Sequence, residues 1–228
     1  LGEDSATAPR PGPEDQARLV RWTGDVRREG LVGPGDSTGE AAARVGELAA
    51  GTPYEAYTLE AYLKAGGSPS RTEPLTLHLD RFDCVSLVES CLAVARVAHR
   101  LAEPEWAAFP REMERMRYRG GRRQGYVSRF HYFSEWLDDN ARRGLVTILG
   151  EELGGQADTR PLRFMSTHAD AYPALAVPAV LAEIAEMERS LDGAPRWVIP
   201  TASIESVADR IETGDVLAFA TSIEGLDV

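Results

Sequence analysis

Cysteine and long apolar segments are scarce in this sequence of 228 residues. The only two cysteines, Cys84 and Cys91, would have Cα atoms about 10.5 Å apart on one helix, beyond the roughly 7 Å that a disulfide allows. At least Cys84 is therefore expected to be a free thiol, and the CxxC spacing of a zinc or redox site is absent. No apolar run is long enough to predict a membrane-spanning helix.

Positive charge is also in short supply. The chain has 25 Lys and Arg against 36 Asp and Glu, which gives a formal net charge of −11. Nucleic-acid binding needs a surplus of basic residues, so this balance argues against a nucleic-acid partner. The length and the apolar fraction are those of a globular protein with one domain or at most two small ones.

The N-terminal stretch, residues 1–17, is rich in Pro, Gly, Ala and acidic residues and is predicted to be a disordered tail or linker. The chain begins with Leu1 rather than Met, as a secreted protein trimmed of its signal or a gene fragment would. Residues 18–228 are predicted to form the folded domain.

Apolar periodicity predicts several helices followed by a few strands. The predicted helices cover residues 18–29, 41–48, 85–103, 105–117, 129–140, 178–191 and 204–211. Alternating or β-branched runs predict strands over residues 75–79, 144–149, 197–200 and 216–221. Helices that precede strands in this way indicate an α+β domain with segregated layers.

Cys84 lies at the predicted start of the most apolar helix, where unpaired N–H groups and the helix dipole favour an anion. A thiolate there has a depressed pKa and is the better nucleophile, and the nearby N–H groups could form part of an oxyanion hole. Asp80 or Asp83 could cap this helix. The alternative is that Cys84 is only the first member of a buried apolar stripe.

The segment around Cys84, residues 82–89 (FDCVSLVE), resembles the Asp-Cys-Ser/Thr-x-x-Val/Glu nucleophile motif of the NlpC/p60 superfamily of papain-like cell-wall hydrolases. Other segments, in the same order along the chain, are similar to its N-acetylmuramoyl-L-alanine amidase-like branch. They are residues 51–54, 58–60, 118–120 (YRG), 128–136 (SRFHYFSEW), 164–168 (FMSTH), 172–173, 214–216 and 225–228 (GLDV). The resemblance covers most of the chain after about residue 30.

The resemblance implies a papain-like α+β fold, with N-terminal helices packed on a C-terminal antiparallel sheet. It implies that Cys84 attacks the amide between N-acetylmuramic acid and L-Ala of peptidoglycan stem peptides, without a metal or other cofactor. Muropeptides would be the partners, and the location would be the cell envelope, periplasmic or secreted. The alternatives are a γ-D-glutamyl-diamino acid endopeptidase of the same fold and a non-catalytic wall-binding module.

The catalytic histidine of the resembled family follows directly on the Gly-Leu-Asp-Val/Ile stretch. Because this chain ends at Val228, that histidine, its orienting residue and the final strands are expected to lie beyond it, so the chain alone is expected to be inactive. His78 is expected to be structural, and His99 lies about four helical turns from Cys84, too far to act on it. Neither His131 nor His168 is expected to be the general base.

The resemblance also predicts residues that contact the substrate. They are Tyr54, Asp83, Arg119, His131, Tyr132, Thr221 and Asp227. For Asp83 the alternative is a helix cap, and for His131 it is membership of a buried aromatic cluster. Arg119 belongs to a basic run that could grip stem-peptide carboxylates, since Arg pairs with carboxylates through two hydrogen bonds, although most of that run fits a solvated helix face.

Overall fold

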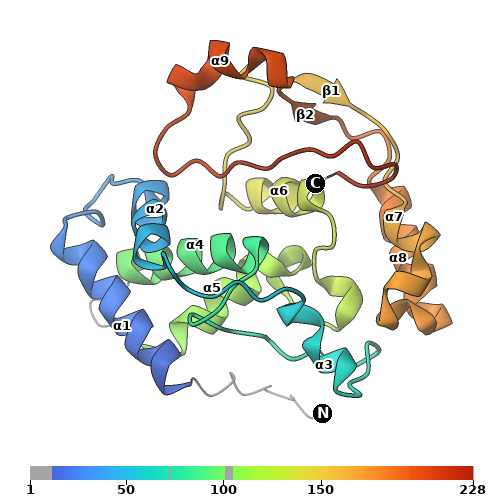
Figure 1. Ribbon diagram of the computed structural model, residues 1–228, viewed down its shortest axis with the longest axis horizontal. Helices are drawn as coiled ribbons and strands as arrows, with labels where there is room; N and C mark the ends of the chain where they lie inside the picture. The colour runs from blue at the N-terminus through green and yellow to red at the C-terminus, as the bar shows by residue number, and fades with distance from the viewer. Residues whose placement is uncertain (1–11, 72, 101–104, 228) are drawn as a thin grey trace. The chain divides into compact units, whose positions relative to one another are not determined.

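The structure is a computed structural model that describes residues 12–71, 73–100 and 105–227 (Figure 1). The chain divides into two compact units. Unit 1 comprises Leu1–Ala61 and Pro74–Arg115, and unit 2 comprises Tyr62–Glu73 and Met116–Val228. Among the described residues, no helix combines the length and the apolar character needed to cross a membrane.

Unit 1 is built on three helices, α1 (Pro13–Arg28), α2 (Thr38–Leu48) and α4 (Cys84–Arg100), and contains most of α5 (Ala108–Arg117). Both α1 and α2 pack against α4 (Figure 1). The apolar stripe predicted for α4 is confirmed, and the short side chains along it allow the helices to approach closely. Buried residues of the three helices include Leu19, Trp22, Val26, Ala41, Val45, Ala93, Val94 and Ala95.

Helix α1 begins at Pro13 rather than at the predicted Arg18. Proline suits the first turn of a helix because its missing N–H has no intrahelical partner there. Two acidic residues, Glu14 and Asp15, complement the positive end of the helix dipole. Residues 13–17 are therefore helical rather than part of a tail, and residues 1–11 of the predicted tail lie outside the described residues.

The strand predicted over residues 75–79 was wrong, although its alternation is real. Leu75, Leu77 and Leu79 are buried, so every second residue faces the interior. The backbone of Leu79 is bonded to helix α1 instead of to a neighbouring strand. Its N–H donates to Asp15 Oδ1 at 2.8 Å, and its carbonyl accepts from Arg18 Nη1 at 2.9 Å. Side chains of α1 thus take the place of a β-ladder.

Unit 2 holds the helices α6 (Phe133–Arg142), α7 (Phe164–Thr167), α8 (Pro178–Ser190) and α9 (Ile204–Val207). Helix α3 (Ala61–Lys64) lies at the first boundary between the units. Seven 3₁₀ turns occur among the described residues. They are Thr58–Glu60, Arg119–Gly121, Tyr126–Ser128, Ala169–Ala171, Pro173–Ala176, Thr201–Ser203 and Ala208–Arg210. Helix α8 closely matches its predicted span.

The sheet found among the described residues has two strands, both in unit 2. Strand β1 (Gln156–Asp158) pairs antiparallel with β2 (Arg196–Val198). Strand β2 overlaps the predicted strand over 197–200, whereas β1 was not predicted. No strand forms over 144–149 or over 216–221, where Leu217 and Phe219 are 62% and 80% exposed. The described residues are thus mostly helical, and the papain-like α+β fold stays a prediction.

The core of unit 2 gathers aromatic and aliphatic side chains from α7, α8 and the turns before them. Its buried members are Tyr126, Tyr132, Leu162, Met165, Ala174, Leu175, Val180, Ile184 and Met187. A fully buried carboxylate, that of Glu188, lies beside them. It accepts hydrogen bonds from the Tyr132 hydroxyl at 2.6 Å and from the Ser166 N–H at 3.1 Å. Both bonds are made to Oε1 and offset part of the cost of burying the carboxylate, whereas Oε2 has no hydrogen-bond partner among the described residues.

Candidate active site

Cys84 is an exposed free thiol at the first residue of α4. The helix start is held by a reciprocal cap, in which the Ser86 N–H donates to Asp83 Oδ1 at 2.7 Å and the Asp83 N–H donates to Ser86 Oγ at 2.9 Å. The expected capping role of Asp83 is confirmed, and its substrate contact stays a prediction. The N–H groups of Cys84 and Val85 have no intrahelical acceptor at these positions, so they are suited to bind an anion.

The other cysteine, Cys91, lies two turns further along α4 and is buried. The two thiols are free, as their spacing predicted. Burial raises the pKa of Cys91 to about 12, which leaves it as an unreactive thiol at neutral pH. Of the two cysteines, only Cys84 is accessible to a substrate.

Tyr54 lies on a segment that is hydrogen-bonded to Phe82, the residue before the capping residue Asp83. The Phe82 N–H donates to the Pro53 carbonyl at 3.1 Å, and the Glu55 N–H donates to the Phe82 carbonyl at 2.9 Å. Tyr54 itself is 72% exposed. The structure therefore places an exposed aromatic ring on a strand-like segment paired with the chain that leads into Cys84.

Tyr57 is a residue of this region that sequence analysis missed. Its φ is +62°, the one positive value at a non-glycine residue among those described, and its side chain is 68% exposed. Such a backbone costs about 1–3 kcal/mol and is found preferentially at functional sites. The adjacent Thr58 donates a hydrogen bond to Asp83 Oδ2 at 3.4 Å, which connects this turn to the cap. No local sequence signal marks Tyr57.

In unit 2, Arg119 is fully engaged with protein groups. Its guanidinium forms a two-pronged ion pair with Glu135, with Nη2 lying 2.8 Å from Oε2, and it also donates to the Val127 carbonyl. The guanidinium carbon lies 5.9 Å from the centre of the Phe130 ring. These contacts give Arg119 a structural role, and its predicted grip on the substrate would require the Glu135 pair to open.

His131 and Tyr132 also contact protein groups. His131 Nε2 lies 2.9 Å from the Tyr126 carbonyl, so that nitrogen carries a proton, and the two rings are 4.5 Å apart. Burial, with a smaller contribution from Arg129, lowers the pKa of His131 well below its usual range. Tyr132 is 1% exposed and donates to Glu188. The aromatic-cluster alternative for His131 is thus supported, and Tyr132 belongs to the core rather than to a ligand surface.

Thr221 and Asp227 close a turn that is anchored within unit 2. Asp227 is 6% exposed, and its Oδ2 accepts from the Ser134 N–H at 2.8 Å, at the start of α6. The Thr221 N–H donates to the Asp227 carbonyl at 3.2 Å. Between them, Gly225 adopts a φ of +78°, and its carbonyl accepts two N–H groups near α7 at 3.0 Å. Asp227 therefore acts as a helix cap, and its predicted substrate contact is untested.

A second buried acid that sequence analysis missed, Glu73, organises the family-like segments of unit 2. Its carboxylate accepts from the Tyr118 hydroxyl at 2.8 Å, from Arg129 Nε at 3.0 Å and from the Tyr62 hydroxyl at 3.2 Å. Glu73 is 2% exposed. It is therefore the common partner of residues 118 and 129 in two of the segments that carried the resemblance. Nothing in the local pattern around residue 73 signals this role.

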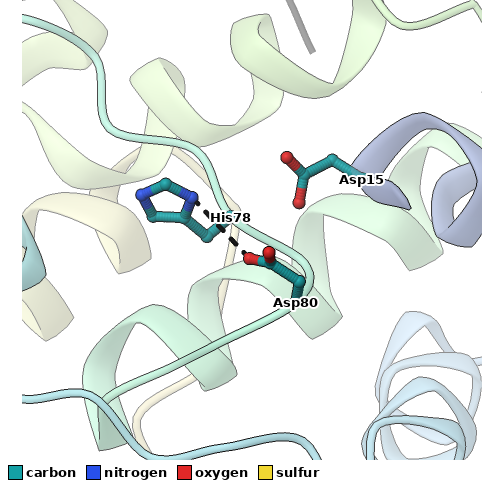
Figure 2. Close-up of side chains that lie close together, drawn as sticks. All are labelled: Asp15, His78 and Asp80. Carbon is teal, nitrogen blue, oxygen red and sulfur yellow. Dashed lines mark ion pairs between the residues drawn. The ribbon is translucent and has the colours of Figure 1, made fainter. Parts of the chain in front are cut away.

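The described residues contain one group of three side chains with the spacing of metal ligands. Asp15, His78 and Asp80, all in unit 1, have ligand atoms within 4.8 Å of one another (Figure 2). Burial, ahead of the nearby Arg81, lowers the pKa of His78, which favours a neutral ring. The expectation that His78 is structural stays a prediction.

Comparison with known proteins identifies the family. Residues 44–228 match the AmiA-like family, described as N-acetylmuramoyl-L-alanine amidase-like. Two crystal structures of an N-acetylmuramoyl-L-alanine amidase from Bacteroides uniformis ATCC 8492 are similar, each with 30% sequence identity, covering 84% of this chain and 77% of the amidase, with TM-scores of 0.74 and 0.75. No curated protein matches. The chain belongs to the N-acetylmuramoyl-L-alanine amidase-like family, which confirms the family that the motifs indicated, while its placement in the NlpC/p60 superfamily stays a prediction.

Proposed function

We propose that this protein is a peptidoglycan amidase that cleaves the bond between N-acetylmuramic acid and L-Ala, with Cys84 as nucleophile. Family membership supports the reaction class. The observation that carries the cysteine mechanism is the exposed Cys84 thiol at the capped start of α4. The same residues support placing the chain in the NlpC/p60 superfamily with a papain-like fold, since papain-like enzymes use a cysteine activated by a histidine.

In the proposed reaction, the Cys84 thiolate attacks the lactyl amide carbonyl and forms a C–S bond. The carbonyl oxygen becomes an oxyanion, which the first-turn N–H groups of α4 are oriented to stabilise. The C–N bond then breaks, the L-Ala nitrogen takes up a proton from the general acid, and the stem peptide leaves. Water hydrolyses the thioester, releasing the muramic acid carboxylate and restoring the thiol.

Mass spectrometry of a muropeptide digest tests the bond that is cut. Release of an intact stem peptide from the sugar is the expected result. Release of an L-Ala–D-Glu dipeptide would instead identify a γ-D-glutamyl-diamino acid endopeptidase. Binding of muropeptides without any cleavage would identify a wall-binding module. Because the substrate is peptidoglycan, we also propose a cell-envelope location.

The nucleophile is tested with Cys84→Ala and the matched control Cys91→Ala. Loss of a catalytic nucleophile typically lowers kcat by several orders of magnitude, about 10³-fold or more, whereas loss of a buried thiol changes mainly stability. Iodoacetamide is expected to label Cys84 faster than a free thiol at neutral pH. If Cys84→Ala kept its activity and a chelator abolished it, the cysteine mechanism would be wrong, and the nucleophile would be a metal-bound water.

A further inference from the structure

The three possible metal ligands of unit 1 come from segments that are far apart in the chain. Asp15 belongs to the first turn of α1, whereas His78 and Asp80 flank Leu79 in the segment before α4. Figure 2 shows the Asp15 carboxylate pointing from α1 toward the side of the His78 ring, with the Asp80 carboxylate next to both. His78 Nδ1 lies 3.9 Å from Asp80 Oδ1.

The arrangement is held by the backbone, independently of any ion. Asp15 Oδ1 accepts the N–H of Leu79 at 2.8 Å, and Arg18 Nη1 donates to the carbonyl of the same residue at 2.9 Å. Residues 78 and 80, on either side of Leu79, are thereby fixed next to Asp15. Asp15 is only 7% exposed, and that one bond engages Oδ1 alone. A buried carboxylate calls for a compensating positive charge.

Arg81 at present neutralises part of this cluster. Its Nη1 lies 3.1 and 3.2 Å from the two oxygens of Asp80, its Nη2 lies 3.1 Å from His78 Nε2, and its Nε lies 3.1 Å from Glu55 Oε2. Arginine only donates, so His78 Nε2 must accept and the ring proton is on Nδ1. The contacts of Arg81 are thus made with Asp80, His78 and Glu55. Among the described residues, the hydrogen-bond donor to the Asp15 carboxylate is the backbone N–H of Leu79.

We propose that Asp15, His78 and Asp80 form a binding site for a divalent transition-metal ion such as Zn²⁺, for which Arg81 competes. Imidazole nitrogen and carboxylate oxygen are zinc ligands at about 2.0–2.2 Å, which places tetrahedral donors about 3.3–3.6 Å apart. The present separations, all within 4.8 Å, need only a small closure. Three protein ligands leave one position for water.

Metal binding has a definite consequence for Arg81. A metal bound at His78 Nδ1 takes the lone pair of that nitrogen, so the ring proton must move to Nε2. Nε2 can then no longer accept from Arg81, whose guanidinium is left with Glu55 as its remaining acidic partner outside the cluster. Bound metal would link α1 to Asp80, which lies four residues before the start of α4 at Cys84.

Zinc titration of the full chain tests this site, by calorimetry and by thermal unfolding. Every protein carries Cys84→Ser, because an exposed thiol would itself bind zinc. We expect one zinc ion per chain and, at a hundredfold excess over Kd, a rise in Tm of about 5–10 °C. His78→Gln and Asp80→Asn should each weaken binding at least about tenfold, a loss in the range reported for altered metal sites. Arg81→Met should strengthen it.

The control is Glu40→Gln, an exposed acid on α2, which should bind zinc like the parent. Zinc bound equally well by the parent and by His78→Gln would mean an adventitious ion only and would overturn the proposal. If a folded Arg81→Met protein bound zinc more weakly than the parent, the claim that Arg81 competes with the metal would be overturned. Since all these proteins lack the Cys84 thiol, their outcome is independent of whether the cysteine mechanism holds.

Discussion

The family-like segments behave differently in the two units. In unit 1, Tyr54 and Cys84 are exposed, and the cap made by Asp83 orients the start of α4. In unit 2, Arg129 and Tyr132 are buried and bonded to the acids Glu73 and Glu188. Motif residues of one family are therefore exposed in one region and part of the buried core in another. The contacts that each residue makes, rather than the motif to which it belongs, distinguish the two groups.

The largest effect is expected for the buried ion pair of unit 2. Arg129→Ala removes the guanidinium that lies 3.0 Å from the buried carboxylate of Glu73, and breaking a buried ion pair by removing one partner typically costs about 3–5 kcal/mol of unfolding free energy. Arg142→Ala is the control, because Arg142 is a 74% exposed partner of Asp139 and its loss should cost at most about 1 kcal/mol. Urea unfolding measures both. Equal costs would remove the structural role assigned to Arg129.

Tyr132→Phe sharpens the comparison between the core and the exposed surface. Removing the hydroxyl leaves the fully buried Glu188 with one hydrogen bond fewer, which should cost about 1–3 kcal/mol. Tyr54→Phe should leave stability unchanged and alter only the turnover of muropeptides. If Tyr132→Phe lowered activity at unchanged stability, Tyr132 would be a substrate contact after all.

Asp83→Ala removes the cap of α4 and should cost about 1 kcal/mol of unfolding free energy. Asp83→Asn keeps an oxygen acceptor for the Ser86 N–H and should restore most of that stability. Because the cap also orients the first turn around Cys84, activity should fall more in the alanine variant than its stability loss explains. Denaturation and muropeptide turnover, measured on both variants, check this. Identical activity in the two variants would contradict it.

The smallest expected effect is on pH dependence. The folded state lowers the pKa of His131, so below its ordinary value of about 6.5 the unfolded chain binds a proton that the folded chain does not. With respect to His131, the free energy of unfolding is therefore highest above about pH 6.5 and decreases as the pH falls below that value. His131→Gln should flatten the decrease in Tm between about pH 6.5 and 5. His168 is exposed, so His168→Gln serves as the control. If it flattened the decrease in Tm equally, the pH dependence could not be assigned to His131.

The predictions from the sequence are most accurate for features that depend on neighbouring residues, such as helices and their caps. The 3.6-residue spacing predicted α4 and α8, and the cap candidate Asp83 accepts a hydrogen bond from the first turn of the helix that follows it. It failed for residues 75–79 and 216–221, which have strand-like composition. A strand requires a partner to complete its hydrogen bonds, and the partner's position is not encoded in the segment itself.

The sequence by itself determined that Cys84 is a free thiol at a helix start and that the chain carries the motifs of an amidase-like family. Spacing, capping and periodicity act within a few residues, so they can be read along the chain. Only the tertiary structure decided the partners of the buried acids, because Glu73 meets Arg129 across 56 positions and Asp15 meets Leu79 across 64. Burial strongly penalises an unpaired polar group, and that penalty selects partners in space rather than in sequence.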